Sequence, residues 1–201
     1  MIETLLFDLG DVLVGLEFDR AYRAASEISR YTPDEIREKL REARLAEPYE
    51  HGQMSSQEFH RRCVELLGLD LEFDQFAELW GNMFSKEQLL DDSLLDSLAG
   101  RYRTVIVSNT NELHMRYIRR EYDVLRHFDE FVLSHEVGVM KPARKFYEKA
   151  LETAKASAAQ CVFIDDRPEN VAGAEAMGIP NILFQGQPRL VESLAALGVK
   201  L

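Results

Sequence analysis

Cysteine pairs and long apolar runs are both missing from this sequence. Cys63 and Cys161 are its only cysteines. Their surroundings place one on a helix and the other at the start of a strand, which predicts reduced core residues instead of a disulfide or a metal site. No apolar run approaches the ~20 residues needed to cross a bilayer, and no signal-peptide pattern precedes the first apolar run. We therefore expect a cytoplasmic protein without a membrane partner.

Basic residues are in the minority. The sequence has 24 Lys and Arg against 35 Asp and Glu, which gives a net charge of −11 over 201 residues. This surplus disfavours binding to nucleic acid or to anionic membranes, since both are polyanions. It also means that a phosphate-binding site must neutralise nearby carboxylates, for which a divalent cation is suited. The length fits one domain or a core with a smaller insert, and we expect a monomer.

Short apolar runs alternate with amphipathic helical patterns in residues 1–14 and 88–201. The runs lack the polar alternation of half-exposed strands, which is typical of buried parallel strands. Strand–helix alternation predicts helices on both faces of such a sheet. The predicted fold class is therefore α/β, with a doubly wound, Rossmann-like parallel sheet. The expected strands are 3–8, 103–108, 130–133, 161–165 and 180–184. The expected helices are 86–99, 111–122, 142–156, 168–178 and 188–197.

Residues 15–87 have a different sequence pattern, in which no short apolar run predicts a strand. Amphipathic patterns predict helices at 18–30, 33–45, 55–68 and 71–84. Three helix starts carry pairs spaced as in a reciprocal N-terminal capping box, namely Thr32 with Glu35, Ser55 with Glu58 and Ser85 with Gln88. We expect an all-helical cap domain at 15–87, inserted into a core domain made of 1–14 and 88–201.

Polar residues follow the apolar runs of the core. Asp8 closes the first run, Ser108 closes the second, and the pair Asp165 and Asp166 closes a later one. Lys141 follows the apolar residues 138–140, which we interpret as another strand that leads into a helix. In open α/β sheets, ligands bind outside the carboxyl ends of the strands. A carboxylate, a hydroxyl, a cation and an acidic pair at that edge are typical of phosphoryl transfer.

These fragments carry a family resemblance. They are Phe7-Asp8-Leu9-Gly10-Asp11-Val12, the run from Ser108 to His114, Lys141-Pro142, and Ile164-Asp165-Asp166 with Asn170. Over its whole length the chain resembles a haloacid dehalogenase superfamily hydrolase with a helical C1-type cap. It is similar in particular to the branch that contains α-D-glucose-1-phosphate phosphatases. The resemblance implies phosphoryl transfer through an aspartyl-phosphate, although a minority of members cleave carbon–halogen bonds.

The chemistry of these residues suggests a role for each. Asp8 is the expected nucleophile, which divides ester hydrolysis into two easier steps. We expect Mg²⁺ to be bound by Asp8, Asp165 and Asp166, with the backbone carbonyl of Gly10 as a further ligand. Either Asp165 or Asp166 would bind the ion directly, and the other through water or hydrogen bonds.

The remaining residues are expected to bind phosphate or to surround the site. Lys141, the Ser108 hydroxyl and the Asn109 backbone N–H are expected to contact the phosphate oxygens. Around them we expect three residues without a direct contact to phosphate or metal. Asn170 would orient the acidic pair, and Asp11 would shape a turn. His114 would be a surface histidine in the first turn of a helix, with a contact to the substrate as the alternative.

One position departs from the family pattern. Phosphatases of this superfamily usually carry a second Asp, two residues after the nucleophile, as general acid/base, and here that residue is Gly10. General acid–base catalysis typically contributes ~10²–10⁴-fold. Either the leaving group hardly needs a proton, as for an anomeric hydroxyl, or the reaction is not phosphate hydrolysis. The sugar-1-phosphate phosphatases also carry Gly there, which favours the first explanation.

The predicted function is Mg²⁺-dependent hydrolysis of small phosphorylated metabolites, with a sugar 1-phosphate as the leading substrate. A second hypothesis is a 2-haloacid dehalogenase, which uses the same Asp8 without a metal. Against it, Asp165 and Asp166 look like metal ligands and would repel a carboxylate substrate. A third hypothesis is a phospho-accepting regulatory domain without turnover. Against that, receiver domains place the acidic pair before the phospho-accepting Asp and have no helical insert.

Overall fold

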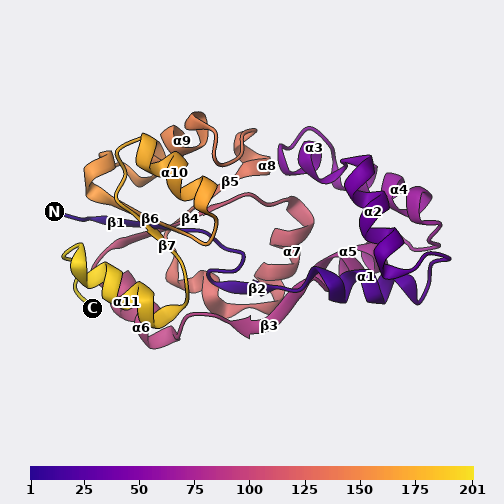
Figure 1. Ribbon diagram of the computed structural model, residues 1–201, viewed down its shortest axis with the longest axis horizontal. Coiled ribbons are helices and arrows are strands. Elements are labelled where there is room, and N and C mark those ends of the chain that lie inside the picture. The colour runs from indigo at the N-terminus through magenta and orange to yellow at the C-terminus, as the bar shows by residue number, and fades with distance from the viewer.

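The computed structural model describes all 201 residues. Its main sheet has five parallel strands in the order β5-β4-β1-β6-β7. The strands are β1 (Thr4–Phe7), β4 (Arg103–Ser108), β5 (Glu130–Leu133), β6 (Cys161–Asp165) and β7 (Asn181–Leu183). The first strand lies at the centre of the sheet, where Phe7 pairs with Ile106 of β4 and Ile164 of β6. The predicted doubly wound α/β core is confirmed (Figure 1).

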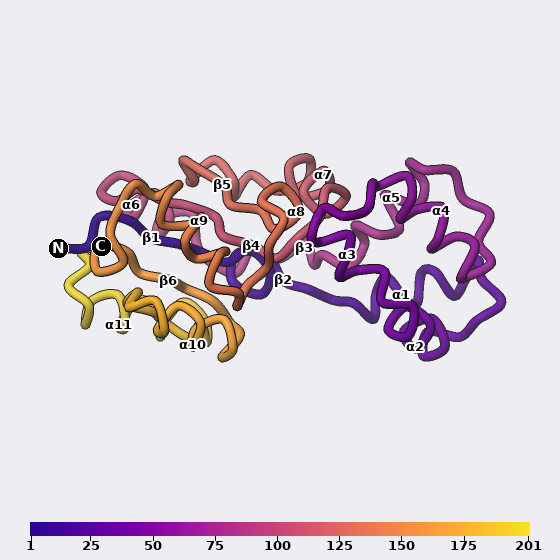
Figure 2. Tube along the Cα trace, turned by 90° about the horizontal axis from the view of Figure 1, so that it is seen from above, coloured from indigo at the N-terminus to yellow at the C-terminus, as the bar shows by residue number.

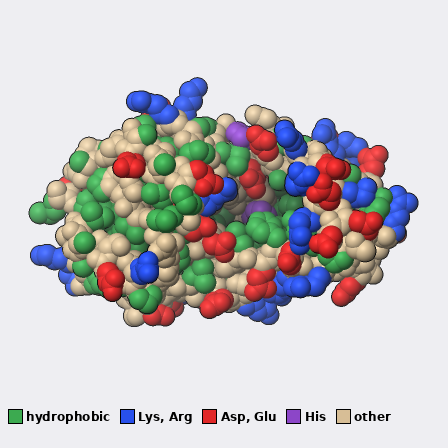
Figure 3. All heavy atoms as spheres, in the orientation of Figure 1, with side chains coloured by type: hydrophobic (Ala, Val, Ile, Leu, Met, Phe, Trp, Pro, Cys, Tyr) green, Lys and Arg blue, Asp and Glu red, His purple; other side chains and the backbone are tan.

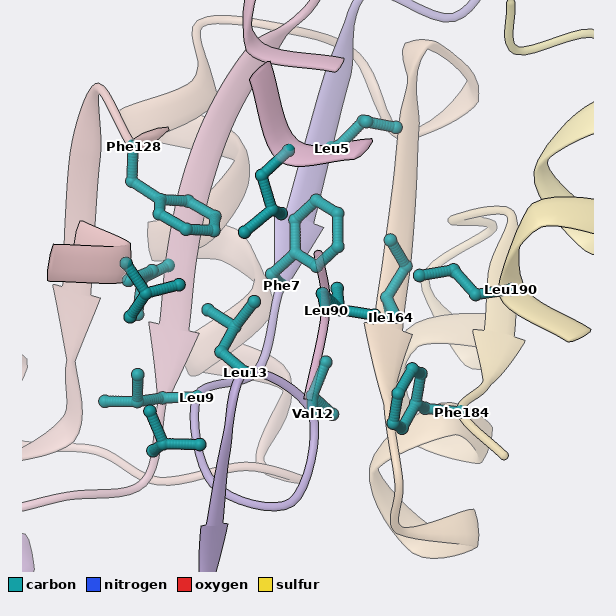
Figure 4. Packing of buried hydrophobic residues seen from close by; sticks show 14 of the residues in the cluster. Leu5, Phe7, Leu9, Val12, Leu13, Leu90, Phe128, Ile164, Phe184 and Leu190 are labelled. Carbon is teal, nitrogen blue, oxygen red and sulfur yellow. The ribbon is translucent and has the colours of Figure 1, made fainter. Parts of the chain in front are cut away.

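Helices cover both faces of this sheet. One face packs on α6 (Asp92–Ala99), α7 (Glu112–Glu121) and α11 (Gln187–Ala196), and the other packs on α9 (Arg144–Ala154) and α10 (Pro168–Ala176). Alternate residues of the strands point to opposite faces of the sheet. Leu5 and Phe7 of β1 pack in the first core, on the face covered by α6, α7 and α11, whereas Leu6 packs in the second core, on the face covered by α9 and α10. Figure 4 shows the first core, in which Phe7 lies edge-on to Phe128. Shorter helical segments are α8 (Ser134–Val137), η1 (Asp123–His127) and η2 (Ala158–Gln160).

A separate lobe holds the helices between β2 and β3 (Figures 1 and 2). They are α1 (Phe18–Ser26), α2 (Pro33–Ala43), α3 (Ala46–Glu50), α4 (Ser56–Leu67) and α5 (Phe73–Gly81). The lobe has its own apolar centre, in which Phe59 stacks on Tyr49 and contacts Phe76. Thr32 forms the reciprocal capping box expected of it, whereas the Ser55 side chain only accepts from the Glu58 N–H. Every helix of the protein is too short or too polar to traverse a lipid bilayer.

Two short strands join the lobe to the core, and the sequence did not predict them. β2 (Val14–Leu16) and β3 (Phe84–Gln88) pair antiparallel, so the expected helix at 86–99 begins only at Asp92. The expected capping box of Ser85 is also wrong, because this residue lies inside β3. The ribbon is tight: a Cβ at Gly15 would lie 2.5 Å from the Ser85 hydroxyl oxygen. This pairing joins segments that are far apart in the chain, so local periodicity carries no trace of it.

The segment before Lys141 also differs from its prediction. Residues 138–140 form no strand: α8 ends at Val137, Gly138 caps it with a left-handed φ of 72°, and the next two residues are irregular. The chain then turns through the cis peptide bond between Lys141 and Pro142 and enters α9 at Arg144. Lys141 therefore reaches the sheet edge from a loop between two helices.

Candidate active site

Two carboxylates meet at the carboxyl edge of the central strands. Asp8 directly follows β1, and its backbone N–H donates to the Ile164 carbonyl at 2.9 Å, which continues the ladder with β6. Asp165 is the last residue of β6 and is fully buried, while Asp8 is 8% exposed. With Asp166, they offer three carboxylate oxygens that lie within 4.8 Å of one another. Parallel pairing of β1 and β6 thus creates an acidic cluster that could hold a cation.

Lys141 supplies the positive charge of the cluster. Its buried ammonium group donates to Asp8 Oδ1 at 2.8 Å, to Asp165 Oδ2 at 2.6 Å and to the Val107 carbonyl at 2.8 Å. Burial works to lower the pKa of Lys141, but the two carboxylates hold it above its ordinary value. Burial raises the pKa of Asp8 to about 6, with the Lys141 charge opposing the rise and the Asp165 charge adding to it. For Asp8, the effect of burial on the pKa thus outweighs the effect of the Lys141 charge.

Asn109 fixes the loop that carries Lys141. The Asn109 side chain donates to the Lys141 carbonyl at 2.9 Å and accepts from the Lys141 backbone N–H at 2.8 Å. The sequence predicted only a backbone contact from Asn109 to phosphate, and this side-chain role was missed. No local signal could have revealed it, because the partners lie 32 positions apart.

Asn170 lies behind the acidic pair. Its side-chain amide donates to the two oxygens of Asp165 at 3.0 and 3.1 Å, and its backbone carbonyl accepts from the Tyr147 hydroxyl at 2.7 Å. The Arg167 backbone N–H donates to Asp165 Oδ1 at 2.9 Å. These bonds fix the Asp165 carboxylate in one orientation. The neighbouring Asp166 is half-buried, and both burial and the Asp165 charge raise its pKa.

Ser108 ends β4 on the same side of the sheet and is buried beside the pocket. It does not cap the following helix, because Asn111 does so by accepting from the His114 N–H at 3.0 Å. The Ser108 hydroxyl is therefore not used as a helix cap and can donate to a ligand in the pocket.

His114 is buried, which corrects its prediction as a surface residue. The first turn of α7 lies under the lobe, where the His114 ring contacts Trp80 and Phe84. Burial, assisted by His135, lowers the pKa of His114 to about 3. The Asn111 amide lies 3.0 Å from His114 Nδ1, so the neutral ring accepts there and carries its proton on Nε2. At neutral pH the His114 ring is therefore uncharged and is not the general acid that a protonated histidine would be.

Asp11 and Gly10 form the turn after the nucleophile position. Asp11 has a left-handed φ of 53°, and its Oδ1 accepts from the Leu16 N–H at 2.8 Å. As predicted for a turn residue, its carboxylate is engaged with the turn itself. Gly10 lies against Leu16, since an added Cβ would be 2.8 Å from Leu16 Cδ1.

A pocket of about 370 Å³ lies over these residues, between the core and the lobe. The space-filling view shows the hollow between the two parts (Figure 3). Core residues on its wall include Asp8, Ser108 and Lys141, and the lobe contributes Phe18 and Glu50. No motif or spacing in the sequence singled out Glu50. Burial raises the pKa of Glu50 to about 7, against the attraction of His51 and Arg167.

Known proteins of similar sequence or fold include phosphatases and a dehalogenase. The chain is 24% identical over 184 residues to a D-ribitol-5-phosphate phosphatase of Bacteroides thetaiotaomicron, with 89% of each protein covered. A family enzyme of that organism, crystallised with magnesium and inorganic phosphate, is similar with a TM-score of 0.83 and 26% identity, covering 92% of this chain and 96% of that chain. A 2-haloacid dehalogenase of Pseudomonas syringae shares the fold, with a TM-score of 0.67, 20% identity, and 98% and 99% of the two chains covered.

A family model described as haloacid dehalogenase-like hydrolase matches residues 2–178. That match runs from the first strand of the core, through the whole helical lobe, to the end of α10. The chain therefore belongs to the haloacid dehalogenase-like hydrolases.

Proposed function

We propose that this hydrolase is a Mg²⁺-dependent phosphatase of small phosphorylated metabolites that works through an aspartyl-phosphate on Asp8. The observation that carries the proposal is the buried contact of 2.8 Å between Lys141 Nζ and Asp8 Oδ1, at the floor of a pocket of about 370 Å³. A carboxylate held beside an ammonium group can meet a phosphate without unopposed repulsion. The similar enzyme crystallised with magnesium and inorganic phosphate supports the same reading.

The acidic cluster fits a divalent cation. Three carboxylate oxygens lie within 4.8 Å of one another, and Lys141 pairs with only two of the residues, Asp8 and Asp165, so the ionised cluster carries more negative than positive charge. Hard oxygen ligands at this density suit Mg²⁺. We assign Asp8, Asp165 and Asp166 as its ligands, with the Gly10 carbonyl as a fourth. When bound, the ion supplies charge compensation for the phosphate oxygens.

The chain's own residues account for the two chemical steps. Lys141 holds Oδ1 of Asp8, so Oδ2 is the oxygen we assign to attack phosphorus. As the bond from Oδ2 to phosphorus forms, the ester P–O bond breaks and the alkoxide departs, taking a proton from water. A second water molecule then hydrolyses the acyl phosphate, which releases phosphate and regenerates Asp8. Lys141, the Ser108 hydroxyl and the Asn109 backbone N–H bind the phosphate oxygens in this scheme.

The site limits which leaving groups the substrate can have, because few of its residues can protonate a departing alcohol. Gly10 carries no carboxyl group, Asp11 is engaged with the Leu16 N–H, and His114 has a pKa of about 3. The core therefore supplies no acid of ordinary strength beside the ester oxygen. A substrate with an acidic alcohol suits such a site, and a sugar 1-phosphate with its anomeric hydroxyl is our leading candidate.

A phosphate-release assay tests this proposal. With Mg²⁺, phenyl phosphate and glucose 1-phosphate should release many phosphates per protein molecule, and excess EDTA should stop the release until Mg²⁺ is restored. Release of at most one phosphate per molecule would indicate a regulatory phospho-acceptor. Chloride release from 2-chloropropionate in EDTA, without phosphate release, would establish the dehalogenase instead.

A further inference from the structure

A second cavity lies inside the helical lobe and differs in character from the pocket over Asp8. It has a volume of about 300 Å³, and thirteen of its seventeen lining residues are hydrophobic, against seven of nineteen for the pocket over Asp8. Its walls come from α1, α2 and α5 and from the end of α4, with Ala25, Ile36 and Phe76 among the buried ones. A cavity of this kind favours an apolar occupant.

The two cavities adjoin. Phe18, Met83, His114 and Glu50 line both of them. A molecule with its phosphate at Asp8 can therefore extend past these four residues into the lobe. Phe18 is 47% exposed, which is high for a phenylalanine, and an apolar group passing between the cavities would cover its ring. Hydrophobic side chains are also visible in the hollow between the core and the lobe (Figure 3).

Both arginines that line the lobe cavity are already paired. Arg37 lies 2.7 Å from the Asp19 carboxylate and 3.1 Å from that of Asp34, and Arg41 pairs with Glu38. A second phosphate or a carboxylate group would meet no free cation there. A sugar would bury several hydroxyl groups against mostly hydrocarbon, which is costly unless each is hydrogen-bonded.

We propose that the lobe cavity binds an apolar substituent of the substrate alcohol, so that the substrate class is an amphiphilic phosphomonoester. This inference rests on the proposed function for the position of the phosphate. The leaving alcohol of a sugar 1-phosphate is acidic enough, but a bare sugar has no apolar group to fill the lobe cavity. An apolar group attached to an acidic hydroxyl satisfies both. Burial of each methylene group should strengthen binding by about fourfold.

Binding of n-alkylphosphonates tests the inference without requiring turnover. We expect the Kd, measured by calorimetry with the Mg²⁺-loaded full chain, to fall about fourfold per methylene from methyl- to hexylphosphonate. Ala25→Leu places three extra carbons in the lobe cavity and should abolish this dependence. Ala24→Leu is the matched control, because Ala24 lies on the same helix but lines neither cavity. Both variants should keep the wild-type Tm within a few degrees.

The Kd values of the alkylphosphonates for the wild-type protein test the inference even if the variants fold poorly. A Kd that does not change with chain length would overturn the inference, and so would tighter binding of glucose 1-phosphate than of hexylphosphonate to Asp8→Asn, in which turnover is abolished. Phosphate release from phenyl phosphate by the same preparation is a separate readout. A steep chain-length series without any phosphate release would retain the apolar site and overturn the proposed hydrolysis.

Discussion

Lys141 Nζ lies 2.8 Å from Asp8 Oδ1, although the two residues are separated by 133 positions in the chain. The same ammonium group bonds Asp165 and the Val107 carbonyl, so a single side chain joins the ends of three strands. Removal of Lys141 leaves the buried carboxylates of Asp8 and Asp165 without their cation, which is costly. Removal of the Asp8 charge leaves Lys141 still paired with Asp165. We therefore expect substitution of Lys141 to lower the free energy of unfolding, and substitution of Asp8 to lower activity without destabilising the protein.

Asp8→Asn should abolish turnover and leave the fold intact. The amide keeps the shape of the side chain and can still accept from Lys141, but it is no nucleophile. We expect phosphate release to fall by at least about 10³-fold, with a Tm at or above that of the wild type, since a carboxylate with a raised pKa is lost. Activity within tenfold of the wild type would contradict the assignment of Asp8.

Lys141→Met should destabilise the protein by about 3–5 kcal/mol in EDTA, because it leaves Asp8 and Asp165 buried without their cation. Lys145→Met is the control, since Lys145 is exposed and the substitution changes the net charge equally. Urea unfolding measures both free energies. Mg²⁺ should recover part of the loss in Lys141→Met if the acidic cluster binds the ion. Equal effects of the two substitutions would show that the buried pairs contribute little.

Glu50→Gln should stabilise the protein at alkaline pH. The pKa of Glu50 is about 7 in the folded protein, above the ordinary value of 4.5, so its contribution to stability is complete below pH 4.5 and is lost as the pH rises through 7. The glutamine does not titrate. At pH 8 the variant should be more stable by about 1–3 kcal/mol, and at pH 4.5 nearly equal.

Urea unfolding at both pH values measures this difference for Glu50. Glu47→Gln, on the same helix but exposed, should show no such trend. A difference between Glu50→Gln and the wild type that stays constant with pH would contradict the raised pKa.

Leaving-group acidity should control the rate, because Gly10 supplies no acid. Nitrophenyl phosphate should be hydrolysed faster than glycerol phosphate by about 10²-fold or more. Gly10→Asp should narrow the gap by accelerating the poor leaving group, provided that Leu16 moves aside for the new Cβ. Kinetics and Tm should be measured together. Equal wild-type rates would mean that another group donates the proton, and Glu50 would be the first to substitute.

The sequence revealed the parts of the site that are encoded locally. Asp8 and Asp165 follow buried apolar runs, and parallel pairing of β1 with β6 brings them together as expected. The β2–β3 ribbon could not be foreseen, since Leu16 pairs with Phe84 across the whole lobe. The burial of His114 depends on Trp80 above it, and the importance of Glu50 depends on where α3 docks. Helical periodicity contains neither kind of information.

The ribbon also makes the lobe a modular insertion. Because Leu16 and Phe84 are paired residues on adjacent strands, the chain leaves the core and returns to it at almost the same place. A two-residue turn suited to a hairpin could join these strands directly. Insertions tolerated by a scaffold typically begin and end at such neighbouring points. Exchanging the residues between Leu16 and Phe84 among related hydrolases could therefore transfer substrate preference and leave the phosphoryl-transfer chemistry with the recipient core.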